Sequence, residues 1–170
     1  MVRAANEKGA PGIARVHVES WRTTYRGIVP EDFLLSLSYE DREARWARSL
    51  SQPQSAQVIY VLEEDGIVGF ASGGPEREGD ALYTSELYTV YLLEAYQGQG
   101  RGRALVQAVA RALQEAGHER LLVWVLADNP ARRFYEALGG KLLKEKAIEL
   151  GGARSLEVAY GMNPDALTAG

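Results

Sequence analysis

Residues 96–105 read YQGQGRGRAL, a run in which three glycines alternate with Gln and Arg before a helix-forming segment begins. The glycines are Gly98, Gly100 and Gly102, and the arginines are Arg101 and Arg103. Glycine reaches backbone dihedrals that other residues avoid, and it lets a ligand approach without a Cβ in the way. The N–H groups at the start of the following helix, with the positive end of its dipole, attract phosphate. The stretch therefore suits a phosphate-binding turn, although a simple connecting loop is equally compatible with the glycine pattern.

Two common phosphate-binding loops do not match this stretch. A dinucleotide fingerprint requires G-x-G-x-x-G, whereas the spacing here is G-x-G-x-G, and a P-loop requires a lysine that the stretch lacks. Binding of RNA through GRGR is a third alternative. It is disfavoured because the motif occurs once in a protein of net charge −4 and pI about 5.3, and phosphate neutralisation needs a basic surface. No nucleic-acid partner is expected.

The composition is that of one globular domain without disulfides. The chain has 170 residues, of which 46% are hydrophobic and 25% charged, which agrees with a single domain of ordinary size. It contains no cysteine, which excludes disulfides, thiolate metal sites and a cysteine acyl-enzyme. Its first residues lack the apolar core of a signal peptide, and its apolar runs are too short to span a bilayer. A cytoplasmic protein without a membrane partner is expected.

Outward from the glycine stretch, hydrophobic periodicity and turn residues divide the chain into strands and helices. Strands are expected at residues 1–5, 81–94 and 120–128, and hairpins at 57–74 and 141–162, with turns at Asp65-Gly66 and Gly151-Gly152. Helices are expected at 10–25, within 27–38, at 38–52, at 102–116 and at 129–138. The strand, helix and strand around the glycine stretch imply a parallel pair, whereas the hairpins imply antiparallel pairing, so the sheet is mixed.

With these flanks, the stretch resembles motif A of the GNAT superfamily, the Gcn5-related N-acetyltransferases, whose pattern is Gln or Arg, two residues, Gly, one residue, and Gly or Ala. Gln97, Gly100 and Gly102 match that pattern. Residues 126–140, LADNPARRFYEALGG, resemble the fifth strand and following helix of the family. The sequence departs from the family at Glu94, where relatives usually have proline, and at Gly140, where an aromatic residue is common.

The resemblance implies an α/β fold with a mixed, mostly antiparallel central sheet and flanking helices, the acyl-CoA N-acyltransferase fold. It implies one domain over residues 1–162, followed by a flexible tail at 163–170. It also implies acetyl-CoA as co-substrate, with no metal, and a homodimer is a frequent state in the family. The cofactor-binding residues that follow from the match are Tyr91 and Leu92, whose backbones would pair with the pantetheine arm; Gln97, Gly98, Gln99, Gly100, Arg101 and Gly102, which would cradle the pyrophosphate; and Asn129.

Asn129 precedes Pro130, so it is also a good helix N-cap, and this role can coexist with a hydrogen bond to the cofactor. Tyr135 is the expected general acid, and Glu86 is the candidate general base. The alternatives are a tyrosine half buried in packing and a strand glutamate that faces solvent; water or another side chain can also serve as the base. Both His17 and His118 are expected to be structural, because their spacing does not suit a metal.

The expected reaction is transfer of acetyl from acetyl-CoA to a primary amine by direct attack in a ternary complex, since no cysteine can carry the acetyl group. Trp21, Tyr25 and Tyr83 are candidates for the wall of an acceptor pocket. The acidic composition favours a cationic acceptor. A non-catalytic acyl-CoA-binding or regulatory module is the alternative, because one fold serves several functions.

Overall fold

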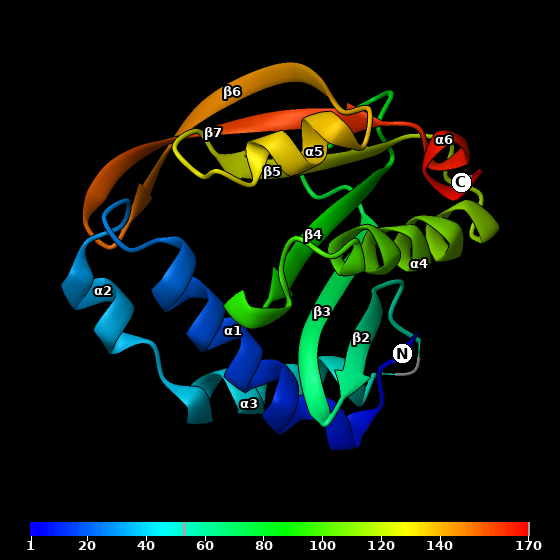
Figure 1. The fold of residues 1–170 in the computed structure, drawn as a ribbon. Coiled ribbons are helices and arrows are strands. Elements are labelled where there is room, and N and C mark those ends of the chain that lie inside the picture. Colours follow the sequence, from blue (N-terminus) through cyan, green and yellow to red (C-terminus); the bar gives the residue numbers. More distant parts are fainter. Residues whose placement is uncertain (53, 170) are drawn as a thin grey trace.

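The computed structural model describes residues 1–52 and 54–169, which form one seven-stranded sheet with helices on both faces (Figure 1). The strand order is β1-β2-β3-β4-β5-β7-β6, and β4 and β5 are the one parallel pair among the described strands. The strands are β1 (Val2–Ala4), β2 (Val58–Glu64), β3 (Gly66–Pro75), β4 (Ser85–Leu92), β5 (Leu121–Leu126), β6 (Lys141–Leu150) and β7 (Ala153–Met162). The expected mixed, mostly antiparallel sheet is confirmed.

The helices are α1 (Ala10–Thr24), α2 (Glu31–Ser36), α3 (Tyr39–Leu50), α4 (Arg101–Glu115), α5 (Arg132–Ala137) and α6 (Pro164–Thr168). Two short 3-10 turns, Glu7–Gly9 and Glu94–Tyr96, precede α1 and the glycine stretch. The hydroxyl of Ser38 accepts a hydrogen bond from the N–H of Asp41 and so caps α3. The helices expected from residues 10, 38 and 102 begin within one residue of those positions, whereas the helix expected from residue 129 begins at Arg132.

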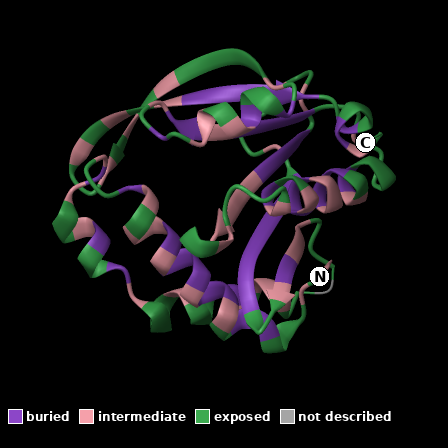
Figure 2. Cartoon of the chain, viewed as in Figure 1, coloured by how far each residue is buried: buried purple, intermediate pink, exposed green. Residues whose placement is uncertain are grey.

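Alternation along β3 divides the core between the two faces of the sheet. Phe70 packs in a cluster with α1 and α3, whereas the next residue, Ala71, packs in the cluster that contains α4, as expected for successive side chains in a strand. Because both faces are covered, β3 is buried along almost its whole length (Figure 2). A Cβ at Gly73 would lie 2.7 Å from a methyl carbon of Val109, so glycine at this position allows α4 to approach the sheet closely.

The C-terminal residues differ from the expected flexible tail. Asn163 accepts a hydrogen bond from the N–H of Asp165 and begins α6, which packs against α4. Leu167 is only 1% exposed and belongs to the core cluster around α4. Burial of this apolar side chain and the N-cap together hold the segment in place up to residue 169, and residue 170 lies outside the described part of the chain.

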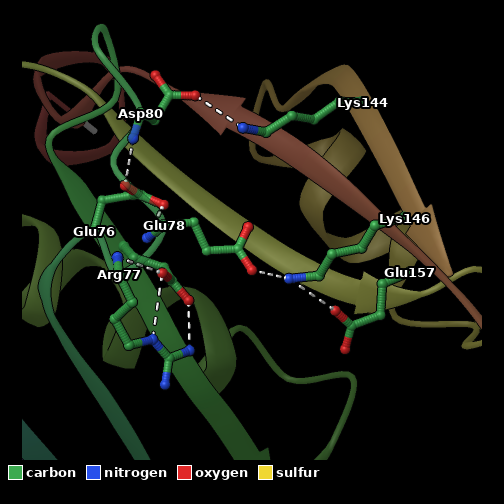
Figure 3. A network of polar contacts seen from close by, with 8 residues as sticks. Glu76, Arg77, Glu78, Asp80, Lys144, Lys146 and Glu157 are labelled. Atoms are coloured by element: carbon green, nitrogen blue, oxygen red, sulfur yellow. Dashed lines mark hydrogen bonds and ion pairs between the residues drawn. The ribbon is translucent and has the colours of Figure 1, made fainter. Parts of the chain in front are cut away.

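Strand β4 is shorter than expected because a turn occupies the residues before it. The carboxylate of Asp80 accepts hydrogen bonds from the N–H groups of Leu82 and Tyr83, each at 2.9 Å. This local bonding replaces ladder hydrogen bonds, so the strand begins at Ser85. The turn places the β3–β4 connection, residues 76–84, beside β6, where Asp80 pairs with Lys144 at 2.9 Å (Figure 3).

Candidate active site

Strands β4 and β5 pair only where they begin and then separate. Their register runs from Ser85 opposite Leu121 to Leu87 opposite Val123. At the point of separation β4 contains a bulge. Leu87 pairs with Gly73, and the next pair joins Thr89 to Ser72, so Tyr88 is the extra residue on β4. A bulge adds one residue, bends its strand and increases its twist. In the described chain, the edge of β4 beyond Leu87 is therefore left without β5 as a partner.

A cavity of about 870 Å³ opens at this separation. Its wall includes the free part of β4, the end of β5, the start of α4, part of α5 and residues of α1, β6 and β7. Of the residues expected to bind cofactor, the wall includes Tyr91, Leu92, Gln97, Gly98, Gly100, Gly102 and Asn129. The tertiary structure thus brings together residues from segments that are distant in the sequence.

The glycine stretch forms the turn into α4 at one end of the cavity. Gly98 and Gly100 have φ angles of 72° and 76°, in the left-handed region that glycine occupies without steric cost. Gly100 is the N-cap of α4 and has no side chain to bond the N–H groups of the first turn. These N–H groups and the positive end of the helix dipole therefore suit a phosphate group.

Two members of the stretch lie outside the cavity wall, and one of them, Arg101, has partners elsewhere. Arg101 forms an ion pair with Glu64 at 3.0 Å and its guanidinium lies 5.0 Å from the centre of the Tyr96 ring. Gln99 and Arg101 are not among the described residues of the cavity wall, whereas Arg103 is. Gly100 and Arg103 are three residues apart, and this spacing puts them on one helix face, a signal that could have singled out Arg103 from the sequence.

Gln97 supports the loop rather than pointing freely into the cavity. Its Nε2 donates a hydrogen bond to the carbonyl of Leu92 at 3.0 Å, and the hydroxyl of Ser20 donates to the same carbonyl at 3.2 Å. The end of β4 is thereby tied to both α1 and the glycine stretch. The backbone carbonyl of Leu92 already has these two donors.

Tyr135 lies in α5 on the cavity wall and is 6% exposed. Burial, with a smaller contribution from Tyr91, raises the pKa of its hydroxyl above the ordinary value, so it carries its proton at neutral pH. The neighbouring Phe134 packs against the start of α4, where a Cβ at Gly102 would lie 3.2 Å from its ring. Close contact at this glycine holds the α5 tyrosine near the glycine stretch.

Asn129 connects the α5 region to the opposite side of the cavity. Its Oδ1 accepts a hydrogen bond from the N–H of Ala131 at 2.9 Å, and its Nδ2 donates to the hydroxyl of Tyr25 at 3.2 Å. It therefore caps the turn that leads into α5. The expected role as helix N-cap is wrong, because α5 begins at Arg132 and its N-cap is Ala131. Burial raises the pKa of Tyr25 above its ordinary value.

Of the three aromatic residues expected at an acceptor pocket, two line the cavity. Trp21 and Tyr25 belong to the cavity wall, and their rings are in contact, with centroids 4.5 Å apart. The expectation for Tyr83 is wrong: its ring packs against Gly161 of β7, where an added Cβ would lie 2.5 Å from the tyrosine hydroxyl. The Asp80 turn places Tyr83 at this position.

Glu86 lies on the cavity wall but is held in an ion pair. It is 2% exposed, and its Oε2 lies 2.6 Å from Nη2 of Arg77. Its Oε1 accepts weaker hydrogen bonds from Nε (3.4 Å) and the backbone N–H (3.3 Å) of Arg77. The guanidinium also lies 4.2 Å from the centre of the Tyr88 ring, and Glu86 raises the pKa of Arg77.

The structure adds cavity residues that the sequence did not single out. Arg77 and Glu78 come from the β3–β4 connection, Trp124 from β5, Lys146 from β6 and Glu157 from β7. The indole N–H groups of Trp21 and Trp124 are buried and have no acceptor within the described residues. These groups give the cavity wall both charge and unused hydrogen-bond donors.

The described residues contain no group of three or more His, Cys, Asp or Glu side chains placed to hold a metal ion. Across residues 1–52 and 54–169, no helix combines the length and apolar character required to cross a membrane.

Comparison with known proteins identifies the family. Residues 16–140 match the sequence profile described as "Acetyltransferase (GNAT) family". The chain is 43% identical over 162 residues to a Bacillus subtilis (strain 168) protein named as the uncharacterized N-acetyltransferase YuaI, covering 94% of this chain and 91% of that protein.

Solved structures share the fold. A PaiA N-acetyltransferase of Thermoplasma acidophilum in complex with coenzyme A gives a TM-score of 0.72 at 18% identity over 96% of this chain and 98% of that one. YncA of Salmonella typhimurium with acetyl-CoA gives 0.72 at 21% identity over 97% and 94%. The resemblance seen in the sequence is confirmed, and the chain belongs to the GNAT family of acetyltransferases.

Proposed function

We propose that this acetyltransferase moves the acetyl group of acetyl-CoA to a primary amine by direct attack within a ternary complex. The observation that carries the proposal is the cavity itself, which joins the start of α4 to Tyr135 and to a group of carboxylates. One cavity thus contains N–H groups that suit phosphate, a tyrosine that can donate a proton, and carboxylates that suit a cationic amine.

The α4 end of the cavity is the proposed site of the pyrophosphate. The first-turn N–H groups after Gly100 and the side chain of Arg103 would hold its charge. The free edge of β4 would pair with the amide groups of the pantetheine arm, with Tyr91 and Leu92 at its far end. At Leu92 the N–H would make this contact, because the carbonyl already accepts hydrogen bonds from Gln97 and Ser20. In this arrangement acetyl-CoA supplies an activated thioester at the point where β4 and β5 separate.

Tyr135 is the proposed proton donor to the departing sulfur. A group that protonates a leaving thiolate must hold its proton at neutral pH, and burial of this hydroxyl has that effect. For the proton that the amine must lose, the cavity wall offers three carboxylates, those of Glu78, Glu86 and Glu157.

The test is release of free CoA from acetyl-CoA in the presence of a panel of amines, monitored with a thiol reagent. We expect release of CoA with at least one primary amine. When the concentrations of both substrates are varied, the double-reciprocal plots of initial rate should intersect rather than run parallel, as a ternary complex requires. Tyr135→Phe should lower kcat about 10²-fold or more. Tyr39→Phe, at an exposed tyrosine outside the cavity, is the matched control.

Two results would contradict the proposal. Binding of acetyl-CoA without CoA release for any amine would support the non-catalytic module instead. Equal activity of Tyr135→Phe and the wild type would remove the assignment of Tyr135 as the proton donor while leaving acetyl transfer in place.

A further inference from the structure

Of the three glutamates on the cavity wall, Glu78, Glu86 and Glu157, the last two have different surroundings. Glu86 has its lone pairs directed at Arg77, with a shortest distance of 2.6 Å, and its side chain is 2% exposed. Both of its oxygens accept hydrogen bonds from Arg77, and the pairing is charge-assisted. The arrangement therefore suits a group that positions Arg77 and the β3–β4 connection rather than one that exchanges protons.

Glu157 has a longer ion pair than Glu86 and is more exposed. Its ion pair is with Nζ of Lys146, at 3.9 Å, and its side chain is 23% exposed. Lys146 also pairs with Glu78, and its ammonium lies 4.1 Å from the centre of the Trp124 ring. Figure 3 shows this lysine placed between the two glutamates. One ammonium is thus shared by two carboxylates, which leaves a surplus negative charge beside Glu157.

The position of Glu157 in the sheet brings it to the separation of β4 and β5. It pairs in register with Leu126 of β5 on one side and with Lys146 of β6 on the other. Leu126 lies three residues beyond Val123, the last β5 residue paired with β4. Adjacent strands are about 4.8 Å apart, so Glu157 borders the free part of β5 and lies on the cavity wall.

Burial and the neighbouring carboxylates of Glu157 together favour uptake of a proton by its side chain. Burial is the main cause that raises its pKa above the ordinary value, and the carboxylates of Glu78 and Glu86 add to the effect. Lys146 and Arg77 oppose it. The titratable and charged groups that face this carboxylate are Lys146 of β6, Arg77 and Glu78 of the β3–β4 connection, and Glu86 and Tyr91 of β4.

We propose that Glu157, rather than Glu86, receives the ammonium group of the acceptor and accepts its proton, an inference that rests on the proposed acetyl transfer to a primary amine. One N–H bond of the ammonium breaks, and its proton passes to the Glu157 carboxylate. The nitrogen bonds to the acetyl carbon, the C–S bond breaks, and sulfur takes the Tyr135 proton. The second nitrogen proton restores Tyr135, and Glu157 releases its proton to solvent, leaving amide and free CoA.

The experiment compares Glu157→Gln with Glu86→Gln by CoA release with the best amine of the panel, from acidic to alkaline pH. We expect Glu157→Gln to lower kcat/KM for the amine by about 10²–10⁴-fold at neutral pH. The loss should shrink as pH rises, because free amine then forms in solution without the glutamate. Glu86→Gln should retain the fall in kcat/KM that the wild type shows at acidic pH, here called the acidic limb of the pH profile. Glu145→Gln, at an exposed residue of the neighbouring strand, is the matched control.

Lys146→Met provides a second test with the opposite sign. Since Lys146 lowers the pKa of Glu157, its removal should move the acidic limb of the wild-type profile to higher pH. The midpoint of thermal unfolding and the affinity for acetyl-CoA are measured for every variant, so that a folding defect is recognised. A purely structural role of Glu157 would lower activity equally at all pH values.

The outcomes separate the two proposals. If the wild type releases CoA and folded Glu157→Gln keeps both its rate and its acidic limb, the assignment of Glu157 is overturned. Loss of that limb in Glu86→Gln would overturn it in favour of Glu86. If the wild type releases no CoA with any amine, the proposed function fails first, and the role of Glu157 fails with it.

Discussion

The indole N–H of Trp46 donates a hydrogen bond to Nδ1 of His17 at 3.1 Å, and both side chains are buried between α1 and α3. An Nδ1 that accepts this bond carries no proton. The imidazole also stacks on Tyr91 of the cavity wall, with ring centroids 5.3 Å apart. His17 therefore has the structural role expected from the sequence, in a cluster that connects the α1–α3 pair to the free edge of β4.

This pair predicts a loss of stability in mild acid. Burial, assisted by the charges of Arg42 and Arg45, lowers the pKa of His17 from 6.5 to about 3. Below pH 6.5 His17 binds a proton in the unfolded chain but not in the folded chain. The free energy of unfolding is therefore unaffected by His17 above this pH and decreases as the pH falls below it. One pKa unit corresponds to about 1.4 kcal/mol, so we expect His17 to cost about 2 kcal/mol by about pH 5.

The measurement is the free energy of urea unfolding at neutral pH and in mild acid. His17→Gln retains an acceptor for Trp46 but cannot titrate, so it should lose this part of the pH dependence. It is expected to be less stable than the wild type at neutral pH, since the replacement disturbs the ring contacts. An unchanged pH slope in the variant would show that His17 does not titrate on unfolding.

The glycine stretch predicts a separation of stability from cofactor binding. Gly100→Ala meets no atom within 4 Å, so its cost comes from the positive φ of 76°, about 1–2 kcal/mol. Relief of that strain would reorient the first-turn N–H groups of α4, so we expect the KM for acetyl-CoA to rise about tenfold or more. Gly117→Ala, just past the other end of α4, has φ 94° and equal space.

Gly117→Ala is therefore expected to lose similar stability in urea unfolding while keeping the KM of the wild type. An equal change of KM in the two variants would indicate that the effect comes from α4 stability alone and not from the geometry of the glycine stretch.

The two arginines of the stretch are expected to differ in their effect on acetyl-CoA binding. Arg103 lies on the cavity wall, whereas Arg101 pairs with Glu64 at 3.0 Å. Arg103→Gln should weaken acetyl-CoA binding several-fold and reduce its dependence on salt, because a charge near the proposed pyrophosphate site is lost. Arg101→Gln should change the Kd by less than twofold. Titration calorimetry at two salt concentrations measures both, and the reverse order would place the pyrophosphate near Arg101.

The C-terminal helix is expected to contribute to the stability of the domain. Leu167 is 1% exposed within the core cluster around α4, so Leu167→Ala should cost about 2–4 kcal/mol. Leu35→Ala, at a leucine that is 65% exposed, should remain within about 0.5 kcal/mol of the wild type. Urea unfolding compares the two. A negligible effect at Leu167 would mean that residues 163–169 behave as the flexible tail expected from the sequence.

The fold could be predicted from the sequence because its signals are local. The apolar stripe of Leu105, Val109 and Leu113 predicts one face of a helix, and all three residues are buried in α4. The Asp65-Gly66 and Gly151-Gly152 turns predict the hairpins that form β2 with β3 and β6 with β7. These patterns depend on residues within one helix turn or one strand, where side-chain periodicity is enough.

The chemistry of the site could be predicted only where it depends on the backbone. Gly98 and Gly100 form the turn into α4 because their positive φ angles are a property of glycine itself. The sequence alone did not separate Arg103 from Arg101, because the ion pair with Glu64 joins residues of β2 and α4. Tyr83 was misplaced for a similar reason, since the Asp80 turn places it against β7.

The sequence by itself thus determined the order of strands and helices up to residue 162, the glycine turn into α4 and the family, because each depends on neighbouring residues. Only the tertiary structure decided which charged side chains meet on the cavity wall. Arg77 pairs with Glu86 within the β3–β4 hairpin, whereas Lys146 lies between Glu78 and Glu157 from three separate segments. The physical reason is that charge neutralisation and burial depend on distances in space, and these follow from strand pairing over long separations in the chain.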